Sequence, residues 1–579
     1  MDAKLSSNTP TYPAAYYLLE GLCEIGIDYL FCNFGTDHAP IIEEIAHRKK
    51  LGLPSPKVIR CSHENTAAHM AAGYAFVTGR GQGVLVHVDV GTANSANAMH
   101  NIFRSRLPVL LMAGKAPYTT GGELTGSRDT YVHFIQEPFD QGSLVRPYIK
   151  WEWTLPSGVV VKEALRRAHT IMQSEPRGPV YLMLPRETLA AHWSEDAIRG
   201  YPAEQFGGMA SGGTDPELVS ELADRLLAAR QPILITAYAG RDPRAARAIE
   251  ELAEFAGISV FEPNSVNNIS HESPCFAGFQ LNKHLPKADF GLLVDVDVPW
   301  FPVDMQPNAG AYWAQIDVDV LKSASPMWTF PGNLRLQGNS GRILEQVLAC
   351  VREKATASFR TAAAARLGQM ATERNERLAR AVKLAADKGK RDEINPHYLF
   401  AEVNKVLSAN DIIFNEAIRN SPAIALQVRR PLPGTLMRGG GGGLGNSGGM
   451  ALGAKLAAPG RMIVQAVGDG SFYFNNPCSV YAASSQYKLP IFTIVLDNAG
   501  WSAVKESTLR VYPGGEAQAQ NAFEAYLAPD PDFAKVGEAF GAYGEKVSDP
   551  ADVPAAIKRC VDAVNSGRSA ILHARVTKL

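Results

Sequence analysis

The sequence has few of the features that would indicate an oxidising compartment or a membrane. Its seven cysteines are scattered and form no Cys-X-X-Cys pair, so neither a disulfide framework nor a zinc site is expected. No apolar run reaches the roughly 18 residues that a membrane span needs. The N-terminal MDAKLSSNTP also lacks the apolar core of a signal peptide. We therefore expect a soluble cytoplasmic protein.

An excess of charge of either sign is absent as well. Lys and Arg total 57 and Asp and Glu total 58, so the formal net charge is -1. This balance provides no basic field that would attract nucleic acid or an anionic membrane. The length of 579 residues predicts three or four domains.

Short apolar strands alternate with helical patterns along most of the chain. In the first part, strand-like segments lie at 27–34, 58–61, 83–88 and 108–114, and helical patterns such as 64–77 separate them. The same alternation recurs in the middle and in the last part of the chain. It predicts an α/β fold class with three doubly wound parallel-sheet domains.

Two segments interrupt this alternation and set the predicted domain boundaries. Residues 191–214 are rich in Gly, Ser and charge, which is typical of a linker, and the Ala-, Arg- and Lys-rich segment 353–392 predicts a helical connector. The predicted domains are therefore 1–190, 215–352 and 393–579. The first and third domains could be related to one another, but a single sequence does not decide this.

The strongest chemical signal is a Gly-Asp-Gly turn in the third domain. Asp469 follows one strand-like segment, and Asn498 follows another strand-like segment 29 residues later. A strand, a helix and a second strand would bring both side chains to the carboxyl edge of one sheet, where such sheets bind ligands. Together with the Gly500 carbonyl they would give three hard oxygens, which is the Mg²⁺ pattern. The alternative is a turn and a cap at unrelated strand ends.

The residues around Asp469 suit a phosphate group. Gly468 and Gly470 let the backbone approach a phosphate closely. Ser471 begins a predicted helix, whose N-terminal amides favour an anion.

This pattern resembles the thiamine-diphosphate motif, in which GDGSF is followed by an Asn at a strand end. Nearly the whole chain resembles the family branch that contains acetolactate synthase, benzoylformate decarboxylase and benzaldehyde lyase. The resemblance implies pyrimidine-binding, central and diphosphate-binding domains in that order, with thiamine diphosphate and Mg²⁺ as cofactors. Two departures are visible: the spacing is slightly longer near Asn475, and the usual Asn-Asn is Asp497-Asn498.

The resemblance also implies a catalytic glutamate and a shared site. Glu64 would hydrogen-bond the cofactor pyrimidine and so promote deprotonation of its thiazolium C2. Taken alone, Glu64 is an ordinary acidic residue of a first helical turn. Because Glu64 and Asp469 belong to different predicted domains, the family's arrangement implies a homodimer or homotetramer with sites shared between subunits.

The glycine tract at 436–460 contains no Gly-Lys-Ser/Thr and so is no P-loop. By resemblance it is the pyrimidine loop, with Leu444 as the apolar wedge under the cofactor, Met450 as the second choice, and the Gly442 carbonyl as a hydrogen-bond acceptor. Glu416 and Asn420 would line the same cleft, although a surface turn accounts for them nearly as well.

Three stretches of the first domain resemble substrate-facing loops of this branch. FGTDHAP contributes Thr36, Asp37 and His38, and VHVDVGTANSANAM contributes His87, which stands where benzoylformate decarboxylase has an acid/base histidine. FIQEPFDQ contributes Gln136, as in benzaldehyde lyase. A histidine can exchange protons with a substrate near neutral pH. The alternative for His87 is a strand histidine satisfied by backbone groups.

These features predict non-oxidative cleavage or formation of a C–C bond next to a carbonyl, in a 2-oxo acid, 2-hydroxy ketone or aldehyde. His87 favours a 2-oxo acid decarboxylase or a benzoin-type lyase. FAD is not expected, because CFAGFQLNKHLPKADF replaces the Gly-Met-His-Gly stretch of acetolactate synthases. Alternatives are acetolactate-synthase-like carboligation, a 2-hydroxyacyl-CoA lyase or oxalyl-CoA decarboxylase activity, and a non-catalytic ligand-binding relative.

Overall fold

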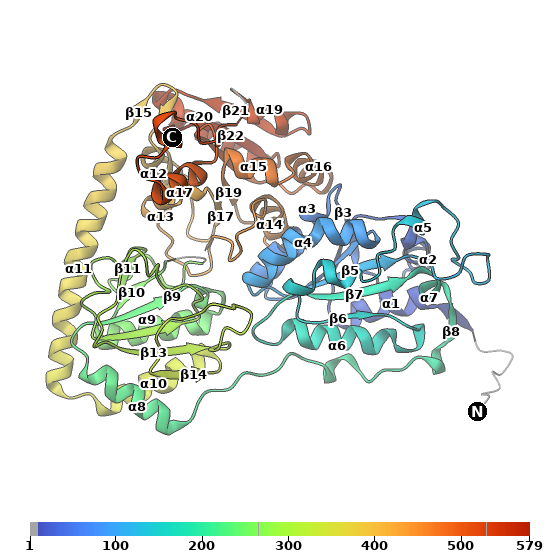
Figure 1. Ribbon diagram of the computed structural model, residues 1–579, viewed down its shortest axis with the longest axis horizontal. Helices are drawn as coiled ribbons and strands as arrows, with labels where there is room; N and C mark the ends of the chain where they lie inside the picture. The colour runs from blue at the N-terminus through green and yellow to red at the C-terminus, as the bar shows by residue number, and fades with distance from the viewer. Residues whose placement is uncertain (1–9, 264–265, 528–529, 579) are drawn as a thin grey trace.

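The computed structural model describes residues 10–263, 266–527 and 530–578, and three six-stranded parallel sheets dominate these residues (Figure 1). The predicted α/β fold class with three parallel-sheet domains is therefore confirmed. The ends of the outer predicted domains, residues 1–9 and 579, lie outside the described residues. In the described part of the chain, no helix is both long and apolar enough to span a bilayer.

The N-terminal sheet has the strand order β3-β2-β4-β5-β7-β6. Its strands are β2 (Tyr29–Cys32), β3 (Lys57–Arg60), β4 (Gln82–Val86), β5 (Val109–Lys115), β6 (Glu152–Thr154) and β7 (Val180–Pro185). The helices are α1 (Ala14–Glu24), α2 (Ala39–Leu51), α3 (Glu64–Thr78), α4 (Val88–Arg104), α5 (Val132–Ile135), α6 (Val161–Gln173) and α7 (Arg186–Ala190). Central strands such as β4 are buried along their whole length, as expected where helices cover both faces.

The central sheet has the order β11-β10-β9-β12-β13-β14. Its strands are β9 (Pro232–Thr236), β10 (Ser259–Phe261), β11 (Phe276–Gly278), β12 (Phe290–Val294), β13 (Tyr312–Asp317) and β14 (Leu334–Gln337), and its helices are α8 (Pro216–Ala228), α9 (Pro243–Ala256) and α10 (Ser340–Lys354). In order along the chain this is 3-2-1-4-5-6, the arrangement of dinucleotide-binding sheets.

The C-terminal sheet has the order β18-β17-β19-β20-β22-β21. Its strands are β17 (Ile412–Glu416), β18 (Leu436–Met437), β19 (Ile463–Gly468), β20 (Phe492–Asp497), β21 (Tyr543–Val547) and β22 (Ala570–Arg575). The helices are α12 (Pro396–Val406), α13 (Ser421–Gln427), α14 (Ser447–Ala457), α15 (Asp469–Phe474), α16 (Pro477–Tyr487), α17 (Ser502–Val511), α18 (Glu516–Ala519), α19 (Phe533–Glu538) and α20 (Val553–Asn565). Within its own domain, each outer sheet has the order 2-1-3-4-6-5. This supports a relationship between the first and third domains.

Two connections differ in character. The predicted linker begins with β8 (His192–Ser194), which pairs antiparallel with β1 (Thr11–Pro13) and so ties its first residues to the N-terminal domain. The predicted helical connector contains α11 (Ala357–Ala386), whose 30 residues extend about 45 Å. In Figure 1 this helix runs along one side of the molecule, from the central to the C-terminal domain, where the short pair β15 (Gly389–Lys390) and β16 (Glu393–Ile394) follows it.

The N-terminal and C-terminal domains meet through α3 and α14, which occupy equivalent places between the second and third strands of their sheets. Both helices are rich in Ala and Gly, so their backbones approach closely. A Cβ at Gly73 would overlap the carbonyl of Met450, and a Cβ at Gly453 would overlap that of Met70. One continuous hydrophobic cluster therefore includes residues of both domains.

The close approach of α3 and α14 predicts that Gly73→Ala destabilises the protein. The added methyl must push the two helices apart, which should cost about 1–3 kcal/mol and lower the midpoint of thermal or denaturant unfolding. Gly460→Ala is the matched control, because a Cβ at that glycine meets nothing within 4 Å. Equal midpoints for the two variants would contradict the prediction.

Candidate active site

Three oxygen-bearing groups meet where β19 and β20 end side by side. Asp469 is the first residue of α15, and Asn498 directly follows β20. One end of the Asn498 amide lies 3.1 Å from Asp469 Oδ1 and 2.9 Å from the Gly500 carbonyl oxygen, and the other end lies 2.7 Å from Ser502 Oγ. The residues predicted to hold the metal are thus brought together at one point of the sheet edge.

The Asn498 amide can face these oxygens in two ways. With its nitrogen toward Asp469 and Gly500 it donates two hydrogen bonds. With its oxygen toward them, three oxygens converge without a donor, and a small cation would stabilise them. The Ser502 hydroxyl satisfies either orientation, since it can donate or accept. One carboxylate, one amide and one carbonyl are all oxygen ligands, a set that fits Mg²⁺ chemistry rather than zinc. The described residues contain no cluster of three or more His, Cys, Asp or Glu suited to a metal.

Charges around this point are controlled by burial and by a histidine. Burial raises the pKa of Asp469 to about 7, and a bound divalent cation would oppose this shift by stabilising the carboxylate. Although burial alone would raise the pKa of Asp497, the hydrogen bond with His573 Nε2, 2.9 Å long, brings it below its usual value. Asp497 also accepts from the Ala499 amide at 3.0 Å and so holds the turn that presents Asn498.

The other residues predicted around Asp469 lie near it in the fold. Gly468 ends β19, and Gly470 and Ser471 follow Asp469 in the first turn of α15, where all three of these α15 residues are buried. Asn420 is half-buried at the start of α13.

The glycine loop that precedes α14 is held by Glu416. The buried Glu416 carboxylate accepts from the backbone amides of Gly445, Asn446 and Ser447. Asn475 donates to Glu416 at 2.9 Å and accepts from the Gly448 amide. Glu416 therefore positions the loop, and as a buried residue it does not fit the surface-turn alternative; its place among the cofactor-binding residues stays a prediction. The unusual residues near Asn475 belong to the same hydrogen-bond network.

The two candidates for the apolar wedge under the cofactor, Leu444 and Met450, lie in different surroundings. Leu444 is half-buried and borders an open cleft of about 550 Å³, whereas Met450 is buried against α3. The cleft is lined by residues of both outer domains: His63, Asn65, Asn94, Asn97, Leu444, Tyr473, Phe474 and Asn476. Gly442 is exposed, and its amide donates to His100 Nε2 at 3.0 Å. Leu444 remains the candidate wedge.

Glu64 is the first residue of α3, and its side chain is only 9 % exposed. Its Oε2 accepts from Asn94 Nδ2 at 3.1 Å. The neighbouring Asn65 donates to the Gly445 carbonyl at 2.8 Å, so the N-terminus of α3 lies against the glycine loop of the same chain. Asn65 and Asn94 were not among the predicted site residues, although the position of Asn65 directly beside Glu64 was a signal.

The predicted substrate loops bring Asp37 between two histidines. Asp37 Oδ1 lies 2.5 Å from His87 Nδ1, and Asp37 Oδ2 lies 3.2 Å from His38 Nε2. A Cβ at Gly114 would overlap the Asp37 carboxylate, so only glycine fits there. Asp37 and His38 are fully buried, whereas the His87 side chain is 17 % exposed. The catalytic roles predicted for Asp37 and His38 stay predictions, and their full burial leaves His87 as the member of this cluster that is partly exposed.

The pKa shifts in this cluster distinguish the two imidazoles. The hydrogen bond with Asp37 raises the pKa of His87 against the effect of burial. Burial lowers the pKa of His38. Burial would raise the pKa of Asp37, but the two histidines together bring it below its usual value. Asp37 is thus an anion that stabilises a protonated His87.

Thr36 and Gln136 lie in neighbouring loops. Thr36 begins the short 3-10 helix that contains Asp37 and His38, and its hydroxyl is 3.0 Å from His133 Nε2. Gln136 caps the C-terminus of α5, one turn after His133. His133 was not among the predicted site residues, because no motif in the sequence indicated it.

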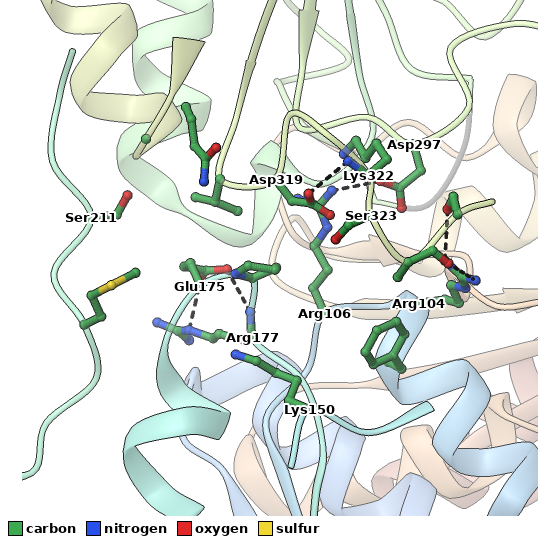
Figure 2. A pocket seen from close by; sticks show the side chains of 18 of the residues that line it. Arg104, Arg106, Lys150, Glu175, Arg177, Ser211, Asp297, Asp319, Lys322 and Ser323 are labelled. Carbon is green, nitrogen blue, oxygen red and sulfur yellow. Dashed lines mark hydrogen bonds and ion pairs between the residues drawn. The ribbon is translucent and has the colours of Figure 1, made fainter. Parts of the chain in front are cut away.

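A second cavity, of about 480 Å³, lies between the N-terminal and central domains (Figure 2). Its charged side chains form ion pairs across the boundary. Arg106 of the N-terminal domain donates to Asp317 and to Asp297 of the central domain, both at 2.8 Å. Lys322, within the central domain, also donates to Asp297 at 2.8 Å. This network fixes the central domain against the N-terminal one.

Comparisons with known proteins match both outer domains. Residues 13–144 match the family described as "Thiamine pyrophosphate enzyme, N-terminal TPP binding domain". Residues 420–574 match "Thiamine pyrophosphate enzyme, C-terminal TPP binding domain". The chain belongs to the thiamine pyrophosphate enzymes.

Within that family the chain is similar to decarboxylases and carboligases. It is 27 % identical to the benzoylformate decarboxylase of Pseudomonas aeruginosa over 83 % of this chain and 85 % of the relative. It is 23 % identical to the acetolactate synthase large subunit of Haemophilus influenzae over 95 % and 92 % of the two chains. The solved 4-hydroxybenzoylformate decarboxylase of Rhodococcus jostii shares the fold, with a TM-score of 0.75, 22 % identity and coverage of 98 % of this chain and 100 % of that chain.

The Asp37–His87 pair predicts that Asp37→Asn lowers the pKa of His87. The neutral amide no longer stabilises the imidazolium, so the proton should leave at lower pH. Titration of His87 by NMR with selectively labelled histidine measures this shift. Asp129→Asn serves as a comparison that removes a different carboxylate, and an unchanged His87 midpoint in Asp37→Asn would refute the assignment.

Proposed function

We propose that this chain is a non-oxidative lyase that cleaves or forms a C–C bond next to a carbonyl, acting on a 2-oxo acid, a 2-hydroxy ketone or an aldehyde. The observation that carries the proposal is the His87–Asp37 pair, a partly exposed imidazole bonded to a fully buried carboxylate. A protonated histidine can give its proton to a carbanion-like centre after CO₂ or an aldehyde has left. Decarboxylation of a 2-oxo acid or benzoin-type cleavage requires such a donor.

Thiamine diphosphate and Mg²⁺ are the cofactors of the proposal. Thiamine diphosphate would supply the nucleophile and the electron sink of the reaction. Asp469, Asn498 and the Gly500 carbonyl would hold Mg²⁺, and Leu444 would support the cofactor from below. Glu64, almost buried at the start of α3, would hold a proton at the pyrimidine ring. The absence of FAD stays a prediction.

Carboligation is the second candidate, because acetolactate synthases match almost the full length of the chain. Both activities fit the same cofactor residues and differ in whether a proton or a second carbonyl compound is taken up.

All seven cysteines lie in the described part of the chain and are free thiols, which supports a reducing compartment such as the cytoplasm.

The experiment that tests the function combines cofactor binding with a substrate panel. Purified protein is loaded with thiamine diphosphate and Mg²⁺, and CO₂ and aldehyde release are followed with benzoylformate, pyruvate, branched 2-oxo acids, benzoin and 2-hydroxyacyl-CoA. Glu64→Gln should retain the cofactor but lose hydrogen–deuterium exchange at its C2, whereas Asp469→Ala should lose the cofactor itself. Failure of the wild-type protein to bind thiamine diphosphate would falsify the proposal, and unchanged C2 exchange in Glu64→Gln would remove the role of Glu64.

We also propose a homodimer, or a tetramer built from it, in which Glu64 of one subunit serves the Asp469 site of another. In the single chain, α3 already contacts the glycine loop, so a site within one chain is the competing arrangement. Co-expression of Glu64→Gln with Asp469→Ala separates the two. A shared site regains activity in mixed dimers, at about a quarter of the wild-type level for random pairing, whereas sites within single chains remain inactive in every combination.

A further inference from the structure

A second histidine–carboxylate pair lies beside the first and contacts Thr36. Thr36 Oγ1 is 3.0 Å from His133 Nε2, and His133 Nδ1 is 3.1 Å from Asp129 Oδ1. Arg186, at the start of α7, donates to both Asp129 oxygens, at 3.0 and 2.7 Å. The His133 side chain is only 2 % exposed, whereas Thr36 is exposed. A buried imidazole thus stands behind an accessible hydroxyl.

The relay depends on the tautomer of His133. Asp129 Oδ1 is the nearest of the three groups that face His133 Nδ1, at 3.1 Å, while two donors, the Asp129 amide and Arg186 Nη1, lie 3.4 Å from the same nitrogen. A carboxylate accepts hydrogen bonds and cannot donate them, so the relay uses the tautomer with its proton on Nδ1, toward Asp129. Nε2 is then free to accept the Thr36 hydroxyl proton. The Thr36 oxygen keeps its lone pairs for a group that arrives from the open side. His133 is close enough to Asp37 and His87 for both to act on its pKa, so the Thr36 hydroxyl that contacts His133 belongs to the same cluster as the His87–Asp37 pair.

We propose that Thr36 and His133 form a proton relay that accepts the hydroxyl proton of a 2-hydroxy carbonyl substrate. The substrate O–H bond breaks and its proton bonds to Thr36 Oγ1, while the original Thr36 proton moves to His133 Nε2. The electron pair of the broken bond stays on the substrate oxygen, and Asp129 stabilises the imidazolium that forms. Thr36 is the group that touches the substrate, and His133 acts through it. The inference rests on the proposed function, because it requires a substrate with such a hydroxyl.

The relay needs a neutral His133 at rest, and its charged neighbours provide one. The groups that face it are Asp129, Arg186, Asp37 and His87. Burial, followed by Arg186, lowers the pKa of His133, while the bond with Asp37 raises that of His87. Two imidazoles with pKa values moved in opposite directions can serve as base and acid in one site. Relay activity should be present above the lowered pKa of His133 and be lost as the pH falls through it.

The test uses the holoenzyme with benzoin as the 2-hydroxy ketone and the pH profile of kcat/KM as the readout. We expect His133→Gln and Thr36→Val to lower kcat/KM by about 10²–10³-fold, with unchanged thiamine diphosphate content. Thr36→Ser should restore most of the loss, because it returns the hydroxyl. Arg186→Gln should move the acidic limb of the profile to higher pH. His192→Gln, an exposed histidine on β8, is the matched control and should behave as wild type.

The outcomes distinguish failure of the relay from failure of the function. Wild-type turnover of benzoin together with near-normal kcat/KM in His133→Gln overturns the relay alone, as does an unchanged acidic limb in that variant. If His133→Gln does not fold, equal activities of Thr36→Val and Thr36→Ser overturn it instead. A wild-type holoenzyme that turns over other substrates of the panel but leaves benzoin intact overturns the relay and keeps the lyase proposal. A protein that turns over nothing in the panel removes both.

Discussion

The backbone contact between α3 and α14 is the constraint on which the rest of the site depends. Small residues on both helices allow a carbonyl of one helix to lie where a Cβ of the other would be. This packing brings Glu64, at the start of α3, beside the glycine loop that leads into α14. Glu416 and Asn475 hold that loop from behind. The candidate cofactor-binding groups of the two domains therefore depend on the absence of side chains at a few helical positions.

The shared strand order of the outer domains determines where the candidate site residues lie. In both sheets the third strand ends at a predicted site residue: β4 leads to His87 and β19 leads to Asp469. Since parallel strands end at the same edge, each domain collects polar groups at one edge of its sheet. In the C-terminal domain this edge carries the oxygens suited to a cation, and in the N-terminal domain it carries the two histidine–aspartate pairs. The hydrogen bond with buried Asp37 raises the pKa of His87, whereas burial and Arg186 lower the pKa of His133.

The thiamine pyrophosphate family and the three-sheet architecture could be predicted from the sequence. Apolar strand runs and the Gly-Asp-Gly to Asn498 spacing are local signals, and they depend only on strand geometry and on the preference of Mg²⁺ for oxygen. The resemblance added Glu64 and the glycine loop. The resemblance could not show how deeply each side chain is buried. Asp37 and His38 look equivalent to His87 in the sequence, but in the structure both are completely buried behind His87.

The sequence by itself therefore determined which elements form and which of their ends carry chemistry. Only the tertiary structure decided which side chains meet. In the folded chain Glu416 holds the glycine loop by hydrogen bonds, and Met450 lies in the interface between α3 and α14. His133, which no motif indicated, contacts Thr36. The physical reason is that strand ends are fixed by local patterns, whereas hydrogen-bond partners and burial depend on segments far apart in the chain, such as Thr36 and His133, that only packing brings together.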